Sequence, residues 1–407
     1  MSTVNRLLDQ RQRAVQPLFI SSYPPRRCGI ANYCRDLIEA MTPLNPFGPA
    51  TIIAMEEGEE RRDYPTEVIG TIAKQDAASY VQAAELINAS SAEIVCLQHE
   101  FGLYGTDHPK RYYGEYVLPF MRAIDRPIVT TLHTILDKPS PTHRKIMEEI
   151  IQLSDIVITM LPSAKQLLED GYGIHADRLV VVPHGVPLYA GPPMEKAKKQ
   201  FGWEGRQVLL MTGLFGPGKG AEYVIKALPQ IVKKFPDVLF VIVGQTHPEL
   251  IKVEGESYRE SLHRLAKRLK VSQHVEYVNE YVSIESLVEY YAACDIYLTP
   301  HLDPQQVSSG TLAYALGMGK PCISTKYVYA KEMLADDRGL LVDFRNSKQI
   351  GEAVNQLLGD PELRARISRN ARALGKTMSW SNVAQRYLNL FRLVLDADDE
   401  ARQELGG

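Results

Sequence analysis

Short apolar runs recur along the chain, and most are followed by a stretch with helical periodicity. In the first half these runs lie at 17–22, 50–55, 93–98, 127–132, 155–160 and 178–183. In the second half they lie at 207–213, 238–244, 274–278, 295–300, 321–325 and 340–344. Continuous apolar strands that alternate with helices indicate a parallel sheet covered on both faces. Because the pattern starts twice, we expect two Rossmann-like, doubly wound α/β domains that face each other across a cleft.

The same pattern places the domain boundaries. The first domain is predicted to span 1–185 and the second 186–378, while the helix-like segment 379–395 has no strand after it. We therefore expect this last helix to return to the first domain and complete it. The Pro/Gly-rich and then basic stretch 184–199 is the best candidate for a linker, and it would serve as the hinge if the domains close on a ligand. The acidic tail after Leu395 is expected to fray.

Composition narrows the class of protein. The 407 residues are 45% hydrophobic and 23% charged, which is typical of a soluble globular protein. The net charge of −3 argues against a broad nucleic-acid-binding face. No window approaches the ~20 apolar residues of a membrane span, and the amino terminus lacks the apolar core of a signal peptide. The five scattered cysteines include no C-x-x-C pair, which favours reduced thiols in a cytoplasmic protein.

No metal site is predicted. Neither the five cysteines nor the ten histidines have the spacing of metal ligands. Asp396 and Asp398 form a D-x-D pattern, but in an acidic tail such a match arises by chance.

Loops that follow strands are where chemistry is expected, because open parallel sheets bind ligands beyond the carboxyl ends of their strands. The first such loop is SYPPRRCGIANYCRDL, after the strand at 17–22. Arg26 and Arg27 bring positive charge, and Gly29 stands where a helix begins. A glycine there lets backbone N–H groups approach an anion. An ordinary strand-to-helix turn explains the loop about equally well.

A second loop, within TGLFGPGKGAEYVIKAL (212–228), carries part of a phosphate-binding motif. The residues from Gly213 to Lys219 satisfy G-x-x-x-x-G-K, but Gly220 replaces the Ser or Thr that would hold Mg²⁺. A nucleoside triphosphatase is therefore disfavoured. A metal-free cradle, made of glycine amides and one lysine around a phosphate, fits the residues better than a plain surface turn.

A third loop, in TPHLDPQQVSSGTLAYALGMGKPCIST (299–325), leads into a helix. Gln306 precedes the helix start at Ser308, Ser309, Gly310 and Thr311. Small residues at a helix start supply caps and free N–H donors that suit a phosphate, although plain N-capping is the more common use of such residues.

Two strands of the first domain end in ionisable side chains. His99 and Glu100 follow the strand at 93–98, and His133 follows the strand at 127–132. All three are expected to face the cleft. A single histidine is more often structural, but two at equivalent strand ends of one sheet favour a site. Together with three candidate anion loops, they indicate a nucleotide-diphosphate ligand without revealing the transferred group.

The motifs also resemble those of a known family over nearly the whole chain. They are Cys28-Gly29-Ile30, Thr131-Leu132-His133-Thr134, Pro183-His184-Gly185-Val186, Gly213 to Gly220 with its lysine, Gly317-Met318-Gly319-Lys320-Pro321 and Ser379-Trp380-Ser381. Each is modest alone, but their order and spacing are similar to those of the retaining glycosyltransferases of family four, which have the GT-B fold.

This resemblance implies transfer of a sugar from a nucleotide-diphosphate donor to a hydroxyl acceptor, with retention at the anomeric carbon and without a metal or other cofactor. The second domain would bind the donor and the first the acceptor. By position, Gly29 would let the donor phosphates approach, and His133 would lie near the transferred sugar. Lys219 would neutralise the diphosphate, and Ser308 to Thr311 would hold it through backbone amides. The leaving phosphate would help to deprotonate the acceptor.

Three positions depart from the family pattern. Leu214 stands where an arginine is usual, and the paired glutamates of the family fall on Gln306 and Tyr314. A neutral hydrogen bond from Gln306 contributes about 0.5–1.5 kcal/mol against roughly 1.5–3 for a charged one. Tyr314 can make one hydrogen bond to a ribose where a carboxylate makes two.

Substitutes for the missing charged groups lie elsewhere in the chain. Arg26 or Arg27 would replace the missing arginine from across the cleft. Asp303 is a candidate substitute for the first glutamate of the family, although it lies three positions before Gln306, where that glutamate would fall.

These observations favour an active retaining glycosyltransferase that uses GDP-mannose or UDP-glucose. A glycoside phosphorylase on the same fold would use the same anion loops without a ribose contact. A catalytically silent, sugar-nucleotide-binding scaffold would explain Leu214 and Tyr314, but not the retained Lys219 and His133. The acceptor is a soluble glycan, a small metabolite or a lipid at a membrane surface. The stretch 108–123 is either a contact for it or a helix with ordinary surface charge.

Overall fold

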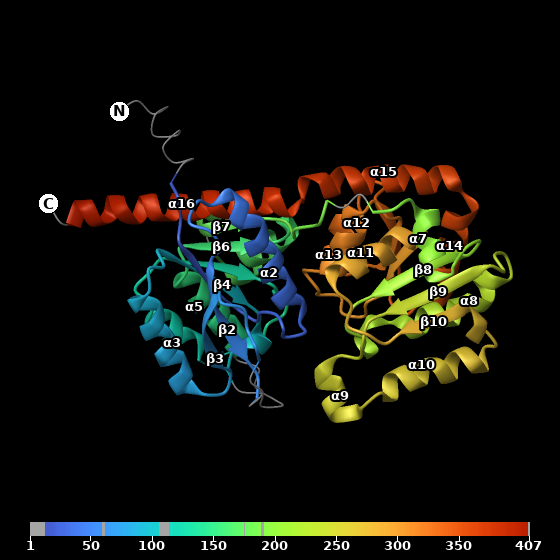
Figure 1. The fold of residues 1–407 in the computed structure, drawn as a ribbon, viewed down its shortest axis with the longest axis horizontal. Coiled ribbons are helices and arrows are strands. Elements are labelled where there is room, and N and C mark those ends of the chain that lie inside the picture. The colour runs from blue at the N-terminus through green and yellow to red at the C-terminus, as the bar shows by residue number, and fades with distance from the viewer. Residues whose placement is uncertain are drawn as a thin grey trace. The chain divides into compact units, whose positions relative to one another are not determined.

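The chain divides into two compact units, each built around a parallel sheet (Figure 1). Unit 1 is Met1–Gly185 with Trp380–Gly407, and unit 2 is Val186–Ser379. The computed structural model describes residues 13–58, 62–105, 114, 116–174, 176–188 and 191–405. The predicted fold class, two doubly wound α/β domains, is confirmed in each unit.

The sheet of unit 1 has the order β3-β2-β1-β4-β5-β6-β7, and all its pairings are parallel. Its strands are β1 (Pro17–Ser21), β2 (Thr51–Glu56), β3 (Val68–Ala73), β4 (Ile94–His99), β5 (Ile128–Leu132), β6 (Ile156–Thr159) and β7 (Leu179–Val181). The strand order reverses between β1 and β4. The edge strand β3 was not predicted, because its residues are mostly half-buried or exposed and do not form a continuous apolar run.

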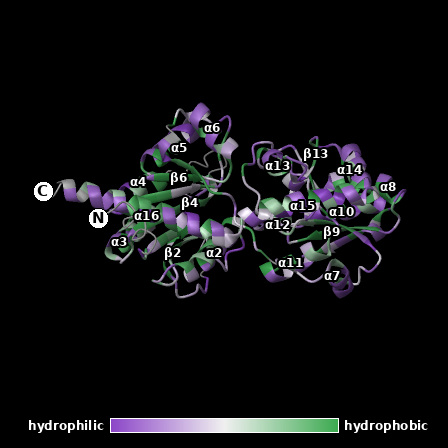
Figure 2. Cartoon of the chain, turned by 90° about the horizontal axis from the view of Figure 1, so that it is seen from above, coloured by the Kyte–Doolittle hydropathy of each residue, from purple (hydrophilic) through white to green (hydrophobic). Residues whose placement is uncertain are grey.

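Helices cover both faces of this sheet. They are α2 (Gly29–Met41), α3 (Ala77–Ala89), α4 (Val117–Arg122), α5 (Pro141–Gln152), α6 (Pro162–Tyr172) and α16 (Trp380–Leu405). Figure 2 shows the labelled strands β2, β4 and β6 as predominantly hydrophobic, with polar residues on the helices. Every residue of β1, β4 and β5 is buried, as expected for strands covered on two sides.

The sheet of unit 2 has the order β10-β9-β8-β11-β12-β13, again all parallel, and it reverses between β8 and β11. Its strands are β8 (Gln207–Thr212), β9 (Val238–Val243), β10 (Val275–Val278), β11 (Ile296–Thr299), β12 (Cys322–Thr325) and β13 (Gly339–Val342). Its helices are α7 (Met194–Phe201), α8 (Ala221–Val232), α9 (Pro248–Glu254), α10 (Ser257–Arg268), α11 (Ile284–Ala293), α12 (Gly310–Gly317), α13 (Val328–Met333), α14 (Ser347–Gly359) and α15 (Pro361–Thr377).

The predicted linker 184–199 is partly helical. Helix α7 begins at Met194 and is held to unit 2 by a buried ion pair, in which Lys198 Nζ lies 2.8 Å from Asp295 Oδ2. The same carboxylate oxygen accepts the backbone N–H of Val208 at 2.7 Å, at the start of the neighbouring β8. The linker is therefore shorter than predicted, because a buried charge pair fixes its second half to the sheet.

The acidic tail is also helical, contrary to the expectation that it frays. Helix α16 continues to Leu405, and its buried side chains recur at helical spacing: Val383, Ala384, Tyr387, Leu388, Phe391, Val394 and Leu395. Beyond them, Arg13 donates to Asp396 at 3.1 Å and to Asp399 at 2.8 Å. The tail carboxylates thus bind a cation from the other end of the chain.

The chain passes between the units twice, at Gly185–Val186 and at Ser379–Trp380. At unit 2, the N–H of Val186 donates to Met378 O at 2.8 Å, and Val186 and Ser379 form an isolated β-bridge. At unit 1, Gly185 lies against Trp380 so closely that a Cβ atom there would be 2.0 Å from the indole ring. A glycine is therefore required at position 185 by packing.

We expect Asp295→Asn to destabilise unit 2 by about 3–5 kcal/mol, because it leaves the ammonium of Lys198 buried without a counter-charge. Urea unfolding followed by Trp203 fluorescence in a Trp380→Phe background measures this unit alone. Asp343→Asn is the matched control, because its pair with Lys326 is about half exposed and such pairs contribute roughly 0–1 kcal/mol. Equal effects of the two substitutions would contradict the prediction.

Candidate active site

The glycine loop of unit 2 follows β8 and lies beside the point where the strand order reverses, which is where open α/β sheets bind ligands. Backbone hydrogen bonds fix the loop on both sides. The Phe215 N–H donates to Gln245 O at 2.9 Å, and the Leu302 N–H donates to Gly218 O at 2.9 Å. The loop is therefore held in one conformation by its two neighbouring loops.

Gly220 explains why the loop is not a nucleoside triphosphatase motif. Its φ of +70° is left-handed, and a Cβ atom there would lie 2.1 Å from the carbonyl oxygen of Pro300. Neither serine nor threonine fits at this position. The residue that would hold Mg²⁺ is thus excluded by the fold of the loop itself.

Lys219 precedes this glycine and lacks a counter-charge. In the described part of the chain, no carboxylate lies within 4 Å of its ammonium group; the neighbour is His301 Nε2, at 3.5 Å. Burial lowers the pKa of Lys219 to about 8. A lysine that is partly withdrawn from water with no carboxylate nearby is well suited to an incoming anion.

His301 was missed by the sequence analysis. It follows β11, is 2% exposed and stacks on Tyr327, with ring centroids 5.4 Å apart. Its Nδ1 lies 3.1 Å from Gln306 Oε1, and the Gln306 side-chain amide donates to Ser308 O at 2.7 Å. His301 lies just after the end of a strand, which is the criterion that identified His133. The same criterion would have identified His301.

Helix α12 begins next to this loop, across the point where the strand order reverses. Ser309 caps it, because its Oγ accepts the N–H of Leu312 at 3.4 Å. The other N–H groups of the first turn have no acceptor within the helix. A Cβ atom on Gly213 would contact Thr311 Cγ2 at 3.6 Å, so the glycine loop and the helix start are adjacent. Tyr314 is 7% exposed and lies mostly within the unit.

In unit 1, His133 follows β5 and is part of a buried hydrogen-bond network. Its Nε2 lies 2.8 Å from Gln98 Oε1, and Gln98 Nε2 donates to Thr131 Oγ1 at 3.4 Å. The Thr131 hydroxyl is 2.8 Å from that of Tyr387, which is 3.0 Å from the hydroxyl of Tyr33. The network fixes the His133 ring through residues of α16, α2 and β4.

The ring of Tyr33 contacts three other aromatic side chains edge-on. Its centroid lies 4.9 Å from that of His133, 5.0 Å from that of His184 and 5.2 Å from that of Trp380. Burial lowers the pKa of His133 to about 3 and that of His184 to about 4. Both imidazoles are therefore neutral near pH 7.

His99 lies in the core of unit 1, contrary to the expectation that it faces an open site. It is 0% exposed, because the chain turns back after β4 and packs Phe101 and Tyr104 on its ring. Neither ring nitrogen has a hydrogen-bond partner among the described residues. Glu100 has a local role, since its Oε2 caps the following turn by accepting the Gly102 N–H at 2.7 Å.

The two arginines of the loop after β1 differ in their exposure to solvent. Arg26 donates to Glu57 at 2.7 Å and to Met55 O at 3.0 Å, so its charge is paired within unit 1. Arg27 is exposed. Gly29 begins α2 with an ordinary φ, and a Cβ atom there would have nothing within 4 Å. The protein itself therefore does not require glycine at position 29.

Several predicted features carry no site in the described residues. No group of three or more His, Cys, Asp or Glu residues there is placed to bind a metal ion. None of the helices in this part of the chain is long and apolar enough to cross a bilayer. Asp303 is exposed and accepts the Gln305 N–H at 2.9 Å. In the stretch 108–123, residues 108–113 and 115 lie outside the described residues, and 117–122 form α4.

Two family descriptions match the chain. Residues 193–374 match Glycosyl transferases group 1, and residues 108–189 match Glycosyltransferase Family 4. Both descriptions are of glycosyltransferases, and the second names family four.

Several similar proteins have names that describe transferases acting on inositol phosphates or inositol lipids. A phosphatidyl-myo-inositol mannosyltransferase of Mycolicibacterium smegmatis is 27% identical over 290 residues, which are 68% of each chain. A GDP-mannose-dependent alpha-(1-6)-phosphatidylinositol monomannoside mannosyltransferase of the same organism is 25% identical over 84% of this chain and 89% of that one. A D-inositol 3-phosphate glycosyltransferase of Corynebacterium urealyticum is 25% identical over 66% of this chain. That match spans less than two thirds of the relative, 64% of its length.

Solved structures share the fold. Sucrose-phosphate synthase from Thermosynechococcus elongatus has a TM-score of 0.76 at 17% identity, covering 94% of this chain and 100% of that one. HepE of Anabaena, in complex with UDP, has a TM-score of 0.72 at 18% identity, covering 92% and 98%. At these identities the likeness concerns the fold alone.

We expect His99→Phe to stabilise unit 1 and to make it less sensitive to acid. Burial lowers the pKa of His99 to about 3, against roughly 6.5 in an unfolded chain. The unfolded state therefore binds the extra proton below pH 6.5, and stability is lost as the pH falls. The substitution should remove up to about 1.4 kcal/mol of this loss per pH unit. Urea unfolding between pH 5 and 7.5, followed by Trp380 fluorescence in a Trp203→Phe background, tests this; an unchanged pH dependence would contradict it.

Proposed function

We propose that the chain transfers a hexosyl group from a nucleotide-diphosphate sugar, of the GDP-mannose or UDP-glucose type, to a hydroxyl acceptor. The observation that carries the proposal is Lys219, a partly buried ammonium with no carboxylate partner in the described residues. It belongs to the glycine loop, whose Gly213 adjoins Thr311 in the first turn of α12. A diphosphate supplies the missing negative charge, and α12 supplies N–H donors for its oxygens. The matches to glycosyltransferase descriptions and the names of the mannosyltransferase relatives support the same donor class.

In this proposal, the bond between the anomeric carbon and the diphosphate oxygen breaks, and a bond from the acceptor hydroxyl to that carbon forms on the same face. The acceptor proton passes to the departing phosphate. Lys219 and the α12 amides stabilise the charge that develops on the leaving group, and no metal is needed for this. Gln306 contacts the sugar hydroxyls, and its side chain is held by His301 and Ser308 O.

The proposed roles in unit 1 concern orientation. His133 is neutral and fixed by Gln98, so it acts as a hydrogen-bonding group near the transferred sugar and not as a cation. Gly29 leaves room for the donor phosphates at the start of α2. Arg26, which pairs with Glu57, or the exposed Arg27 is the proposed substitute for the arginine absent at Leu214. The acceptor proposed for unit 1 is a polyol or glycan hydroxyl, in line with the inositol-directed relatives.

A glycoside phosphorylase is the second candidate. The observation that favours it is the mostly buried Tyr314 at the position where the family has a ribose-binding glutamate. Such an enzyme would bind phosphate at Lys219 and would not recognise a nucleoside.

We expect GDP or UDP, with its sugar conjugate, to bind the wild-type chain, and Lys219→Met to weaken that binding about 10- to 100-fold, because a charged hydrogen bond is lost. Wild-type affinity should also fall as the pH rises through about 8, where Lys219 loses its proton. Calorimetric titrations between pH 6.5 and 9.5 measure both effects. Lys226→Met, on the exposed side of α8, is the control. Binding of phosphate but of no nucleotide, abolished by Lys219→Met, would establish the phosphorylase instead.

We expect Gly29→Ala to lower donor affinity without lowering stability. The added methyl group meets no protein atom within 4 Å, so its effect must come from a ligand. Gly171→Ala in α6 is the matched control, because a Cβ atom there also fits, with Leu167 Cδ1 at 3.8 Å. Gly171 does not belong to the loop after β1. Thermal unfolding and titration with the nucleotide measure the two quantities; equal donor affinities in both variants would refute a role for Gly29.

A further inference from the structure

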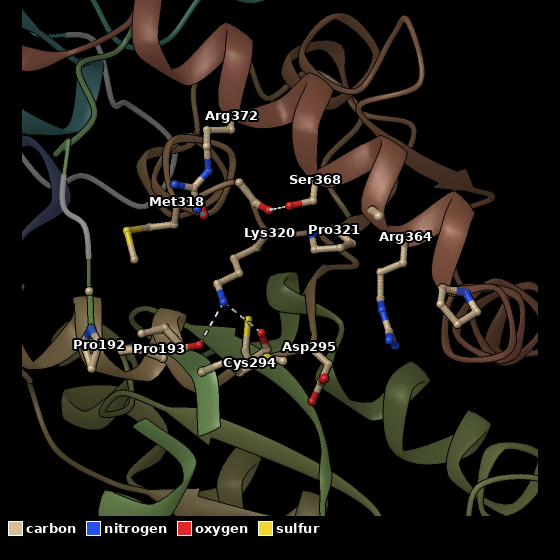
Figure 3. Close-up of a pocket in the computed structure, with 16 residues that line it drawn as sticks. Pro192, Pro193, Cys294, Asp295, Met318, Lys320, Pro321, Arg364, Ser368 and Arg372 are labelled. Atoms are coloured by element: carbon tan, nitrogen blue, oxygen red, sulfur yellow. Dashed lines mark hydrogen bonds between the residues drawn. The ribbon is translucent and has the colours of Figure 1, made fainter. Parts of the chain in front are cut away.

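A cavity of about 520 Å³ lies in unit 2 (Figure 3), and its lining includes neither Lys219 nor His301. Its walls come from residues 191–194 at the start of α7, from the end of α11, from the turns that lead into β11 and β12, and from one face of α15. The α15 residues are Pro361, Arg364, Ala365, Ser368 and Arg372, which recur at helical spacing.

The cavity lies at the amino ends of the strands of the unit 2 sheet, and the candidate active site lies at their carboxyl ends. Asp295 and Pro321, which line the cavity, directly precede β11 and β12. Lys219 and His301 belong to loops that follow β8 and β11. Because the strands are parallel, their amino ends form one edge and their carboxyl ends the other. A ligand in the cavity would therefore be distinct from one at Lys219.

The cavity is lined by three cations. Lys320, Arg364 and Arg372 contribute positive charges, and of the described lining residues Asp295 alone has a carboxylate. That carboxylate is already bound by Lys198, at 2.8 Å, and by the Val208 N–H, at 2.7 Å. The positive charge of the cavity wall is therefore not compensated by its own carboxylate.

The cations are held by neutral groups. Lys320 Nζ donates to Ala292 O at 2.9 Å and to Cys294 O at 3.1 Å, which leaves one of its three N–H donors. Arg372 donates to Met318 O at 3.1 Å. The Arg364 guanidinium has no hydrogen-bond or ion-pair partner among the described residues, and Figure 3 shows it extending from α15 toward the strand side of the cavity.

We propose that this cavity is a second anion site of unit 2, which binds a phosphate dianion, either free or as the phosphomonoester of a small metabolite. A guanidinium group donates two parallel hydrogen bonds to phosphate oxygens, and a lysine ammonium adds a point charge. A phosphate monoester carries close to two negative charges near pH 7, which the three lining cations are sufficient to neutralise. The volume lies within the ~300–1,000 Å³ range of small-molecule sites.

The site also touches the far end of helix α12. Ser368 Oγ donates to Gly319 O at 2.6 Å, and Arg372 binds Met318 O, both just after this helix ends at Gly317. The start of α12 is the proposed donor-phosphate site. The two proposed sites therefore lie near opposite ends of this eight-residue helix, and at its carboxyl end the cations and not the helix would attract the anion.

The test is calorimetric titration of the full chain with inorganic phosphate and with glycerol 3-phosphate, at constant ionic strength. The variant Arg364→Gln/Arg372→Gln removes two cations of the cavity. The control Arg366→Gln/Arg369→Gln removes the same charge from exposed positions of α15 outside the cavity. The variant Lys219→Met removes the proposed donor site. Thermal unfolding checks that every variant is folded.

We expect saturable binding whose dissociation constant rises more than tenfold in Arg364→Gln/Arg372→Gln and stays unchanged in the control and in Lys219→Met. Tighter binding of glycerol 3-phosphate identifies a phosphomonoester as the ligand, and equal binding identifies free phosphate. Nucleotide binding should survive in Arg364→Gln/Arg372→Gln, which separates this proposal from the donor site. Binding that is lost only in Lys219→Met, binding insensitive to all variants, or no saturable binding at millimolar ligand would overturn it.

Discussion

A parallel sheet that is covered on both faces restricts where polar chemistry can occur in each unit. The strands β1, β4 and β9 are buried at every residue, so ionisable side chains there would have to leave water entirely. Charged groups are instead concentrated in the turns at the two ends of the strands. In unit 2, Lys219 and His301 lie at the carboxyl ends of the strands. Lys198, Asp295 and Lys320 lie at the amino ends. The layout of both proposed sites follows from this constraint.

Two lysines in unit 2 show how local partners decide what a buried charge does. Lys198 is neutralised by Asp295 and joins α7 to the sheet. Among the described residues, the side-chain partner of Lys219 is the neutral His301, at 3.5 Å, and burial lowers the pKa of Lys219. The first arrangement is complete without a ligand. The second is electrostatically incomplete, and this is the basis of the binding role proposed for Lys219.

Much of the fold could be predicted, because continuous apolar runs such as VLFVIVG at 238–244 mark strands buried on both faces. The edge strand β3 could not, since its half-exposed residues lack such a run. The adjacency of the glycine loop and the start of α12 was predictable from the rule for strand ends, whereas the burial of His99 was not. It depends on Phe101 and Tyr104 packing back on the ring, and nothing in the local sequence specifies that packing. The pairing of Lys198 with Asp295 joins positions 97 residues apart, beyond the reach of any local pattern.

The insertion of unit 2 between two parts of unit 1 has a consequence for how the chain folds during synthesis. The core of unit 1 includes Tyr387 and Phe391 of α16, which leave the ribosome after all of unit 2. Unit 1 therefore cannot complete its core when its sheet strands emerge, although domains generally fold from the amino terminus onwards. Unit 2 is continuous in sequence, with its ends joined by the bridge between Val186 and Ser379, and it can finish first. The unit whose synthesis begins first is thus the one whose core must be completed last.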